Sequence, residues 1–229
     1  MAHPKYSLKQ IAKTIDHSLL KPEMTRDEVK VGCEIAKKYD VASVCCKPAD
    51  VKFCADLLKG TDVEIGTVVG FPHGSSATQT KVFETKQAIA DGATEIDVVL
   101  NIGLLKSGLH KEVQDDIAAV VNAASGKAVK VILENAYLTE SEKVTACKLT
   151  EAAGADYVKT STGYAPTGAT IADIKLMRSS VSPKMKIKSA GGVRTLDVLM
   201  EYLDAGISRS GATTTSIMLD EYVERFGRD

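Results

Sequence analysis

Two lysine residues occupy positions where an ordinary solvated side chain would be unusual. Lys159 lies in the segment "GADYVKTSTGY", and Lys188 lies in "KIKSAGGVRT". Each follows apolar, strand-like residues and leads directly into a loop rich in glycine, serine and threonine. An ammonium group in an apolar wall is costly unless it is paired or neutral, so both lysines are candidates for chemistry.

The spacing of these lysines predicts that they affect each other. They are separated by 29 positions, the length of one strand–helix repeat, so we expect them to end neighbouring strands. At about 5 Å and an effective dielectric near 20, two ammonium groups repel by roughly 3 kcal/mol, or about two pKa units. Burial lowers the pKa of an amine further, and a lysine titrating near neutral pH can form a Schiff base. We interpret Lys159 as the imine-forming residue and Lys188 as its activator, in preference to Lys186, which lies two residues deeper.

Two glycine- and threonine-containing loops predict a seat for a phosphate group. "SAGGVRT" follows the seventh predicted strand, "SGATTT" follows the eighth, and each is expected to open a helix. Glycine lets the backbone approach a ligand, and helix N-termini offer N–H donors to an anion. The alternative is that these glycines only form turns. The candidate binding residues are Gly163, Gly191, Gly192, Gly211, Thr213 and Thr214.

Other polar residues near the predicted strand ends have weaker claims. Asp97 interrupts an apolar segment and is either a structural ion-pair partner or a proton-transfer group close to the amines. Asp16, His17 and Ser18 end the first predicted strand, where they either bind substrate hydroxyls or have a structural role. Glu134 ends the fifth strand and is expected to act only behind the residues that contact substrate.

Short apolar segments alternate with helical patterns along the chain, and these elements must position the candidate residues. Since several segments are apolar at nearly every position, we expect parallel strands that are covered on both faces. Eight strand–helix units in 229 residues predict a single (β/α)₈ TIM-barrel domain over residues 1–229, with a doubly wound open sheet as the alternative. The predicted strands are "KTIDHSLL", "VASVCC", "VEIGTVVG", "EIDVVL", "AVKVIL", "DYVK", "KIKSA" and "ISRS".

An internal repeat supports these units. Three glycines each follow a helical stretch, as expected for a residue that terminates a helix. The residue five positions after each glycine is Asp97, Lys159 or Gly211, so we expect these three at comparable heights in the barrel. The glycines are Gly92, Gly154 and Gly206.

The composition excludes several classes of function. The net charge of −1 offers no basic excess for a nucleic-acid partner, and no apolar run is long enough to span a membrane. The four histidines show no metal-ligand spacing, so we expect no metal site. The five cysteines are odd in number and scattered, which predicts reduced thiols in a cytoplasmic protein. Cys45 and Cys46 are expected in the core, and no role is predicted for His73.

With these segments in place, the sequence resembles the deoxyribose-phosphate aldolase family of class I aldolases. The resemblance covers nearly the whole chain and is strongest in "VKTSTG" and the later "KSAGG". It implies cleavage of 2-deoxy-D-ribose 5-phosphate to D-glyceraldehyde 3-phosphate and acetaldehyde, in deoxynucleoside breakdown. Lys159 would form the imine, Lys188 would tune it, and Asp97 would handle protons through a bound water. The six residues of the predicted phosphate seat would hold the phosphate of this sugar substrate, without metal or other cofactor. We also expect a homodimer or homotetramer.

The chain departs from the family pattern at a few positions. Lys47 stands where a neutral residue is commoner, Thr213 and Thr214 replace serines, and Ser210 replaces an apolar residue; "ENAYL" is also atypical. These departures affect the details of the pocket more than the reaction. Two alternatives remain: a transaldolase-like Schiff-base aldolase for another sugar phosphate, and a sugar-phosphate-binding barrel without catalysis.

Overall fold

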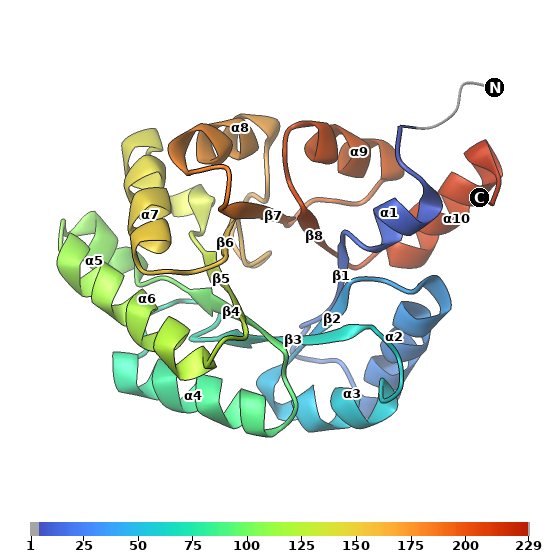
Figure 1. The fold of residues 1–229 in the computed structure, drawn as a ribbon, viewed down its shortest axis with the longest axis horizontal. Helices are drawn as coiled ribbons and strands as arrows, with labels where there is room; N and C mark the ends of the chain where they lie inside the picture. The colour runs from blue at the N-terminus through green and yellow to red at the C-terminus, as the bar shows by residue number, and fades with distance from the viewer. Residues whose placement is uncertain (1–4, 229) are drawn as a thin grey trace.

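Within residues 5–228, the part of the chain that the computed structural model describes, eight parallel strands close into a barrel surrounded by helices (Figure 1). The strands follow one another in sequence order around the barrel, and the last pairs with the first. The predicted TIM barrel is therefore confirmed, and the open-sheet alternative is wrong. The strands are β1 (Ile15–Leu19), β2 (Ser43–Cys46), β3 (Glu64–Val69), β4 (Glu95–Val99), β5 (Ala128–Ile132), β6 (Tyr157–Lys159), β7 (Lys186–Ala190) and β8 (Arg209–Ala212).

The helices form the outer layer of the molecule, and the first and last of them lie together beside the β1–β8 junction (Figure 1). None of the helices in the described residues is long and apolar enough to cross a membrane. The α-helices are α1 (Leu8–Ala12), α2 (Arg26–Tyr39), α3 (Val51–Leu57), α4 (Thr78–Ala90), α5 (Ile102–Lys106), α6 (His110–Ala124), α7 (Glu140–Ala152), α8 (Ile171–Ser180), α9 (Leu196–Asp204) and α10 (Thr215–Phe226). Two short 3₁₀ helices are η1 (Pro48–Asp50) and η2 (Asn135–Tyr137).

Local sequence signals explain where several helices begin. Thr25 starts α2 and Thr139 starts α7, each in a reciprocal pair of hydrogen bonds with a glutamate three residues later. Such capping boxes satisfy backbone N–H groups that the first helical turn leaves unpaired. The start of each helix, and hence the length of the preceding loop, is therefore encoded locally.

The alternation of residues along the strands separates two environments. Val98, Val158 and Ile187 point outward and belong to the core between strands and helices. Their neighbours Asp97 and Lys188 point into the barrel, because successive side chains of a strand face opposite sides of the sheet. A polar interior is thus enclosed by an apolar layer.

The β6–β7 register places the two lysines on adjacent strands as predicted, and the structure makes three corrections at the strand ends. Lys159 and Lys188 are register partners on adjacent strands, but Lys188 lies two residues before the end of β7. The segment "SAGGVRT" does not open a helix directly, because α9 begins only after Thr195 caps it. Gly211 belongs to β8 itself and not to the loop that follows.

Candidate active site

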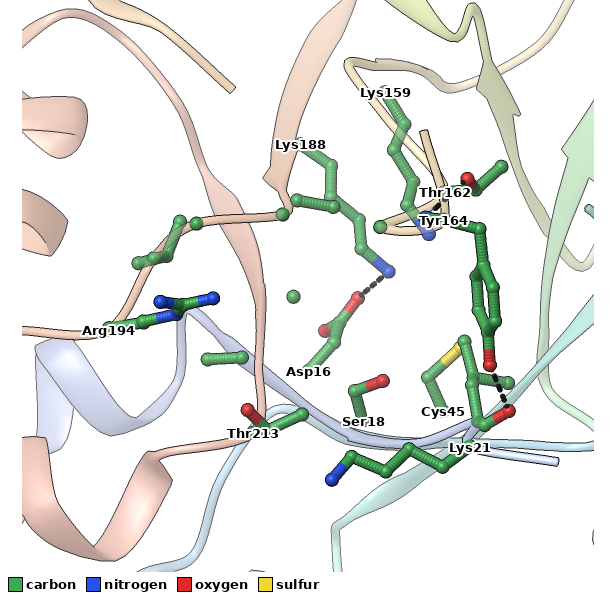
Figure 2. A pocket seen from close by; sticks show the side chains of 18 of the residues that line it. Asp16, Ser18, Lys21, Cys45, Lys159, Thr162, Tyr164, Lys188, Arg194 and Thr213 are labelled. Atoms are coloured by element: carbon green, nitrogen blue, oxygen red, sulfur yellow. Dashed lines mark hydrogen bonds and ion pairs between the residues drawn. The ribbon is translucent and has the colours of Figure 1, made fainter. Parts of the chain in front are cut away.

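A cavity of about 490 Å³ opens at the end of the barrel where the strands lead into their following loops. Its walls come from the loops after β1, β6, β7 and β8, and its floor comes from residues inside the barrel (Figure 2). Asp97 lies beneath this lining, fully buried. The predicted residues that line the cavity are Asp16, Ser18, Lys159, Gly163, Lys188, Gly191, Gly192, Gly211 and Thr213.

A carboxylate joins the two lysines at the floor of the cavity. Lys159 Nζ and Lys188 Nζ each donate to Asp97 Oδ2 over 2.6 Å. The side chains of the lysines are only 3% and 1% exposed, respectively. The expectation of two amines that simply repel each other is therefore incomplete, because Asp97 lies between them.

The surroundings of the two amines shift their pKa values in opposite directions. Burial lowers the pKa of Lys159; Asp97 opposes this, Lys188 adds to it, and the net shift is downward. Burial also disfavours the charge of Lys188, but the carboxylates of Asp16 and Asp97 outweigh it and raise its pKa. The predicted direction for Lys159 is thus confirmed, with burial rather than repulsion as the largest cause.

Three further charged residues lie inside the barrel, and the sequence did not single them out. Lys130 Nζ lies 3.2 Å from Asp97 Oδ1 and 2.8 Å from Glu95 Oε2. Arg209 Nη2 donates to the same Glu95 oxygen over 2.6 Å. A signal for Lys130 was present, since it is the one charge within the apolar segment "AVKVIL".

The first strand divides its polar residues between the inside and the outside of the barrel. Asp16 points inward, accepts from Arg209 Nε over 2.6 Å and also pairs with Lys188. Burial disfavours its charge, but these cations hold the pKa of Asp16 below its ordinary range. Ser18 lines the cavity, whereas His17 faces outward and bonds through Nδ1 to Thr215 Oγ1 over 2.8 Å.

The predicted phosphate seat is assembled from three chain segments. Gly163 follows β6, Gly191 and Gly192 follow β7, and Gly211 and Thr213 come from β8 and its loop. The remaining candidate, Thr214, lies beside the lining: its hydroxyl donates to the carbonyl of Arg194 over 3.2 Å.

A close backbone approach brings two of these loops together. A methyl group added at Gly168, in the loop after β6, would lie 2.2 Å from the carbonyl oxygen of Gly191. Ala169 N donates to that same oxygen over 3.0 Å. The β6 and β7 loops are therefore in direct contact, and only glycine fits at position 168.

Three side chains at the mouth of the cavity were not predicted (Figure 2). Arg194 comes from the loop after β7, and Lys21 from the loop after β1. Tyr164 comes from the β6 loop; its hydroxyl donates to the carbonyl of Leu20 over 2.9 Å, and its ring stacks edge-on against Phe71 at 5.5 Å. Polar side chains in exposed loops are common, so no sequence pattern distinguished these three.

Glu134 supports the β6 loop from behind, as expected. It adopts a positive φ of 56°, which is uncommon for a residue other than glycine. Its carboxylate accepts from the backbone N–H of Thr162 over 3.1 Å and from the Thr162 hydroxyl. That hydroxyl in turn accepts from Tyr164 N over 3.0 Å. Glu134 thereby fixes the loop that connects Lys159 with Tyr164.

The structure shows the surroundings of the adjacent cysteines Cys45 and Cys46, and of Lys47 and Ser210, two residues that depart from the family pattern. Burial raises the pKa of Cys45, which lines the cavity, to about 11, so it is a thiol at neutral pH. Cys46 belongs to the core. Lys47 donates to the carbonyl of Met24 over 2.8 Å. Ser210 accepts a buried hydrogen bond of 2.9 Å from Ser189, which explains a polar residue at this position.

Residues 5–228 contain no group of three or more histidine, cysteine, aspartate or glutamate side chains placed to hold a metal ion. The chemistry at the floor of the cavity belongs to an amine beside a carboxylate. An amine with a lowered pKa is suited to attack a carbonyl carbon, and the carboxylate is suited to proton transfer. The glycine-lined wall is suited to an anion.

Known proteins match this chain over most of its length. The model of a family described as DeoC/LacD family aldolase matches residues 10–223. A deoxyribose-phosphate aldolase of Bacillus mycoides (strain KBAB4) is 53% identical over 213 residues, covering 92% of this chain and 96% of that protein.

Solved structures of aldolases share the fold. A putative deoxyribose-phosphate aldolase from Coccidioides immitis superposes with a TM-score of 0.92 and is 38% identical, covering 96% of this chain and 88% of that one. A deoxyribose phosphate aldolase from Aeropyrum pernix, whose structure is described as a unique tetramer, has a TM-score of 0.88 at 28% identity and covers 94% of this chain and 92% of that one.

Proposed function

This chain belongs to the DeoC/LacD aldolase family, and we propose that it works through a Schiff base on Lys159. It is a lyase that cleaves 2-deoxy-D-ribose 5-phosphate reversibly to D-glyceraldehyde 3-phosphate and acetaldehyde, a step of deoxynucleoside breakdown. The observation that carries the mechanism is the 2.6 Å contact between the buried Lys159 amine and Asp97. An amine whose pKa is lowered by burial is nucleophilic, and a carboxylate at hydrogen-bond distance is positioned to move protons.

The proposed reaction begins at the aldehyde carbon of the open-chain sugar. Lys159 Nζ attacks C1, and loss of water gives a protonated imine. The bond between C2 and C3 then breaks: its electrons move into the imine to form an enamine, while the C3 hydroxyl loses a proton and becomes the aldehyde of glyceraldehyde 3-phosphate. Protonation of the enamine carbon and hydrolysis release acetaldehyde and the free lysine.

We assign the proton transfers to Asp97, acting through a water molecule, with Lys188 as its cationic partner. Asp97 is fully buried, and the three lysines around it outweigh the cost of burial and hold its pKa well below the ordinary range. It is therefore a carboxylate at neutral pH and can accept a proton relayed from the C3 hydroxyl. Lys188 stays protonated and stabilises this charge.

We assign the phosphate to the loops after β6, β7 and β8. Backbone N–H groups at glycines approach an anion closely, and hydroxyl or guanidinium groups add donors. In addition to the predicted glycines and Thr213, Arg194 lines this wall of the cavity. Thr214 would act only indirectly, through its hydrogen bond to the Arg194 carbonyl.

We propose that catalysis requires no metal or other cofactor, because the protonated imine itself draws electrons from the breaking bond. We also propose a cytoplasmic homodimer or homotetramer. The five free, buried cysteines support the cytoplasmic location, and the tetramer described for the Aeropyrum pernix aldolase supports the oligomer.

Reductive trapping tests the mechanism. Borohydride added with deoxyribose 5-phosphate should attach a substrate fragment to Lys159, mapped by peptide mass spectrometry. Lys159→Arg should abolish both trapping and turnover, since a guanidinium stays protonated. Lys186→Arg, which changes an exposed lysine of β7, is the matched control and should remain active. A chelator should leave the rate unchanged. An adduct on another lysine, or turnover by Lys159→Arg, would contradict the assignment.

A further inference from the structure

A cluster of seven charged side chains from six strands fills the interior of the barrel around and below Lys159. It combines three carboxylates with four cationic side chains. Such a group is expensive to bury unless its charges compensate one another. The members are Asp16 of β1, Glu95 and Asp97 of β4, Lys130 of β5, Lys159 of β6, Lys188 of β7 and Arg209 of β8.

The contacts within the cluster form one connected network. Asp97 meets Lys159 and Lys188 through Oδ2 and Lys130 through Oδ1. Glu95 Oε2 lies 2.8 Å from Lys130 and 2.6 Å from Arg209. A change of charge at Glu95 or Lys130 therefore reaches Lys159 through a single shared carboxylate, Asp97.

The charges of the cluster balance only when Lys159 is neutral. Asp16, Glu95 and Asp97 supply three negative charges, and Lys130, Lys188 and Arg209 supply three positive charges. A proton on Lys159 leaves one uncompensated positive charge in the interior. The pKa directions agree: those of Lys130, Lys188 and Arg209 are raised, and that of Lys159 is lowered.

Three other titratable side chains lie beside this cluster: those of Cys45, Tyr157 and the exposed Lys186, whose Nζ lies 5.3 Å from the Tyr157 ring. Cys45 of β2 lies near Lys159, and burial raises the pKa of its thiol to about 11. The ring of Tyr157 of β6 lies 5.6 Å from Lys130 Nζ. A thiol whose pKa is raised in this way adds no charge near neutral pH, and the charge of the exposed Lys186 is screened by solvent.

We propose that Glu95, Lys130 and Arg209, which do not line the cavity, set the protonation state of Lys159 through the charge balance of this buried cluster. They are positioning residues that act through Asp97 and Asp16. The proposal rests on the proposed function only in taking Lys159 as the imine-forming residue.

The proposal predicts that removal of a positive charge and removal of a negative charge shift the pKa of Lys159 in opposite directions. Lys130→Met removes a positive charge, so a proton on Lys159 would restore the balance and the pKa of Lys159 should rise. Glu95→Gln removes a negative charge with little change in shape, so the pKa of Lys159 should fall. The double variant removes one charge of each sign, and its pKa should return toward that of the wild type.

The measurement is the pH dependence of reductive trapping with acetaldehyde and cyanoborohydride, followed on the Lys159 peptide between pH 6 and pH 9. Each single variant should move the midpoint by about one unit, a change of about tenfold in trapping rate on the acid side. Lys130→Arg keeps the charge and should stay near the wild-type midpoint. Lys81→Met is the matched control, because Lys81 is a buried lysine paired with Asp116 at 2.6 Å between α4 and α6, outside the barrel interior.

Opposite shifts with restoration in the double variant support the proposal, since structural damage would not speed trapping in Glu95→Gln. Unchanged midpoints in folded variants, or equal shifts in Lys81→Met, overturn it. If Lys130→Met fails to fold, the downward shift of Glu95→Gln decides alone. Acetaldehyde traps the lysine without the sugar phosphate, so the two proposals can fail separately. If the variants shift the midpoint as expected but the wild-type enzyme does not cleave deoxyribose 5-phosphate, the proposed function is refuted and this inference stands. If the wild-type enzyme cleaves deoxyribose 5-phosphate but the variants leave the midpoint unchanged, this inference is refuted and the proposed function stands.

Discussion

At the scale of single residues, the most informative feature is the carboxylate between the two lysines of the active site. Repulsion between Lys159 and Lys188 alone would destabilise both charges equally. Asp97 pairs equally with both amines, and Asp16 removes the symmetry, because it pairs with Lys188 and not with Lys159. One amine is therefore kept charged and the other is left free to act as a nucleophile.

Lys188→Met should raise the pKa of Lys159 by about one to two units, because it removes a repelling charge and leaves Asp16 and Asp97 short of a cation. Trapping at pH 7 should slow and should recover partly at higher pH. Lys188→Arg keeps the charge and should retain more of the wild-type profile. An equal loss at every pH would mean that Lys188 acts directly on the reacting sugar instead.

Gly211→Asp should weaken binding of the phosphorylated sugar far more than binding of free deoxyribose, because a carboxylate repels the phosphate dianion. We expect KM for the phosphorylated substrate to rise at least about tenfold, equivalent to about 1.4 kcal/mol. Gly211→Ala is the size control: a methyl group there would lie 3.4 Å from Ala190 Cβ and 3.7 Å from Lys188 Cε, which are ordinary contacts. Equal losses for both substrates would show that this strand end does not bind phosphate.

At the scale of elements, strands and helices were predictable because their signals are local. Apolar segments that alternate with helical patterns marked all eight units, and glycines after helical stretches marked three of them. Lys159 and Lys188 were recognisable because each precedes a glycine-containing loop. Lys130 has the same apolar surroundings but no such loop. Its partners Glu95 and Arg209 lie on β4 and β8, and which charges meet inside a closed barrel depends on strand register and stagger. No local pattern encodes that arrangement.

The contact between the β6 and β7 loops is a second feature without a local signal. Gly168→Ala should destabilise the fold by about 2 kcal/mol, because its methyl group has no room beside the Gly191 carbonyl. It should also raise KM for the sugar phosphate by displacing the glycines of the β7 loop. Urea unfolding and steady-state kinetics measure the two effects.

Gly103→Ala is the matched control, since Gly103 lies within α5 and alanine is favoured there. It should leave KM unchanged and increase the free energy of unfolding slightly. Normal stability and KM in Gly168→Ala would show that the two loops can separate without cost.

At the scale of the whole molecule, a buried histidine, His17, makes the free energy of unfolding depend on pH. His17 is packed between the barrel and α10, and burial lowers its pKa to about 4. The unfolded chain binds a proton on this residue near pH 6.5, whereas the folded chain resists protonation down to about pH 4. Stability from His17 is therefore complete above pH 6.5 and is lost as the pH falls toward 4.

This loss should amount to about 3 kcal/mol for His17. His17→Asn should flatten the dependence of the free energy of unfolding on pH between about 6.5 and 4. The exposed His110 provides the control, since His110→Asn should keep the wild-type slope. Urea unfolding at a series of pH values measures both, and an identical slope in all three proteins would contradict the role of His17.

The pairing of Asp16 with Arg209 joins residues 193 positions apart, from the first strand and the last. During synthesis, Asp16 leaves the ribosome long before Arg209 exists, and no other strand supplies a guanidinium for it. A nascent chain that lacks β8 also leaves the barrel open between β7 and β1, because β8 pairs with both of these strands. The barrel consequently matures only after its C-terminal strand has been translated, so that closure of the fold and completion of the active site are one event.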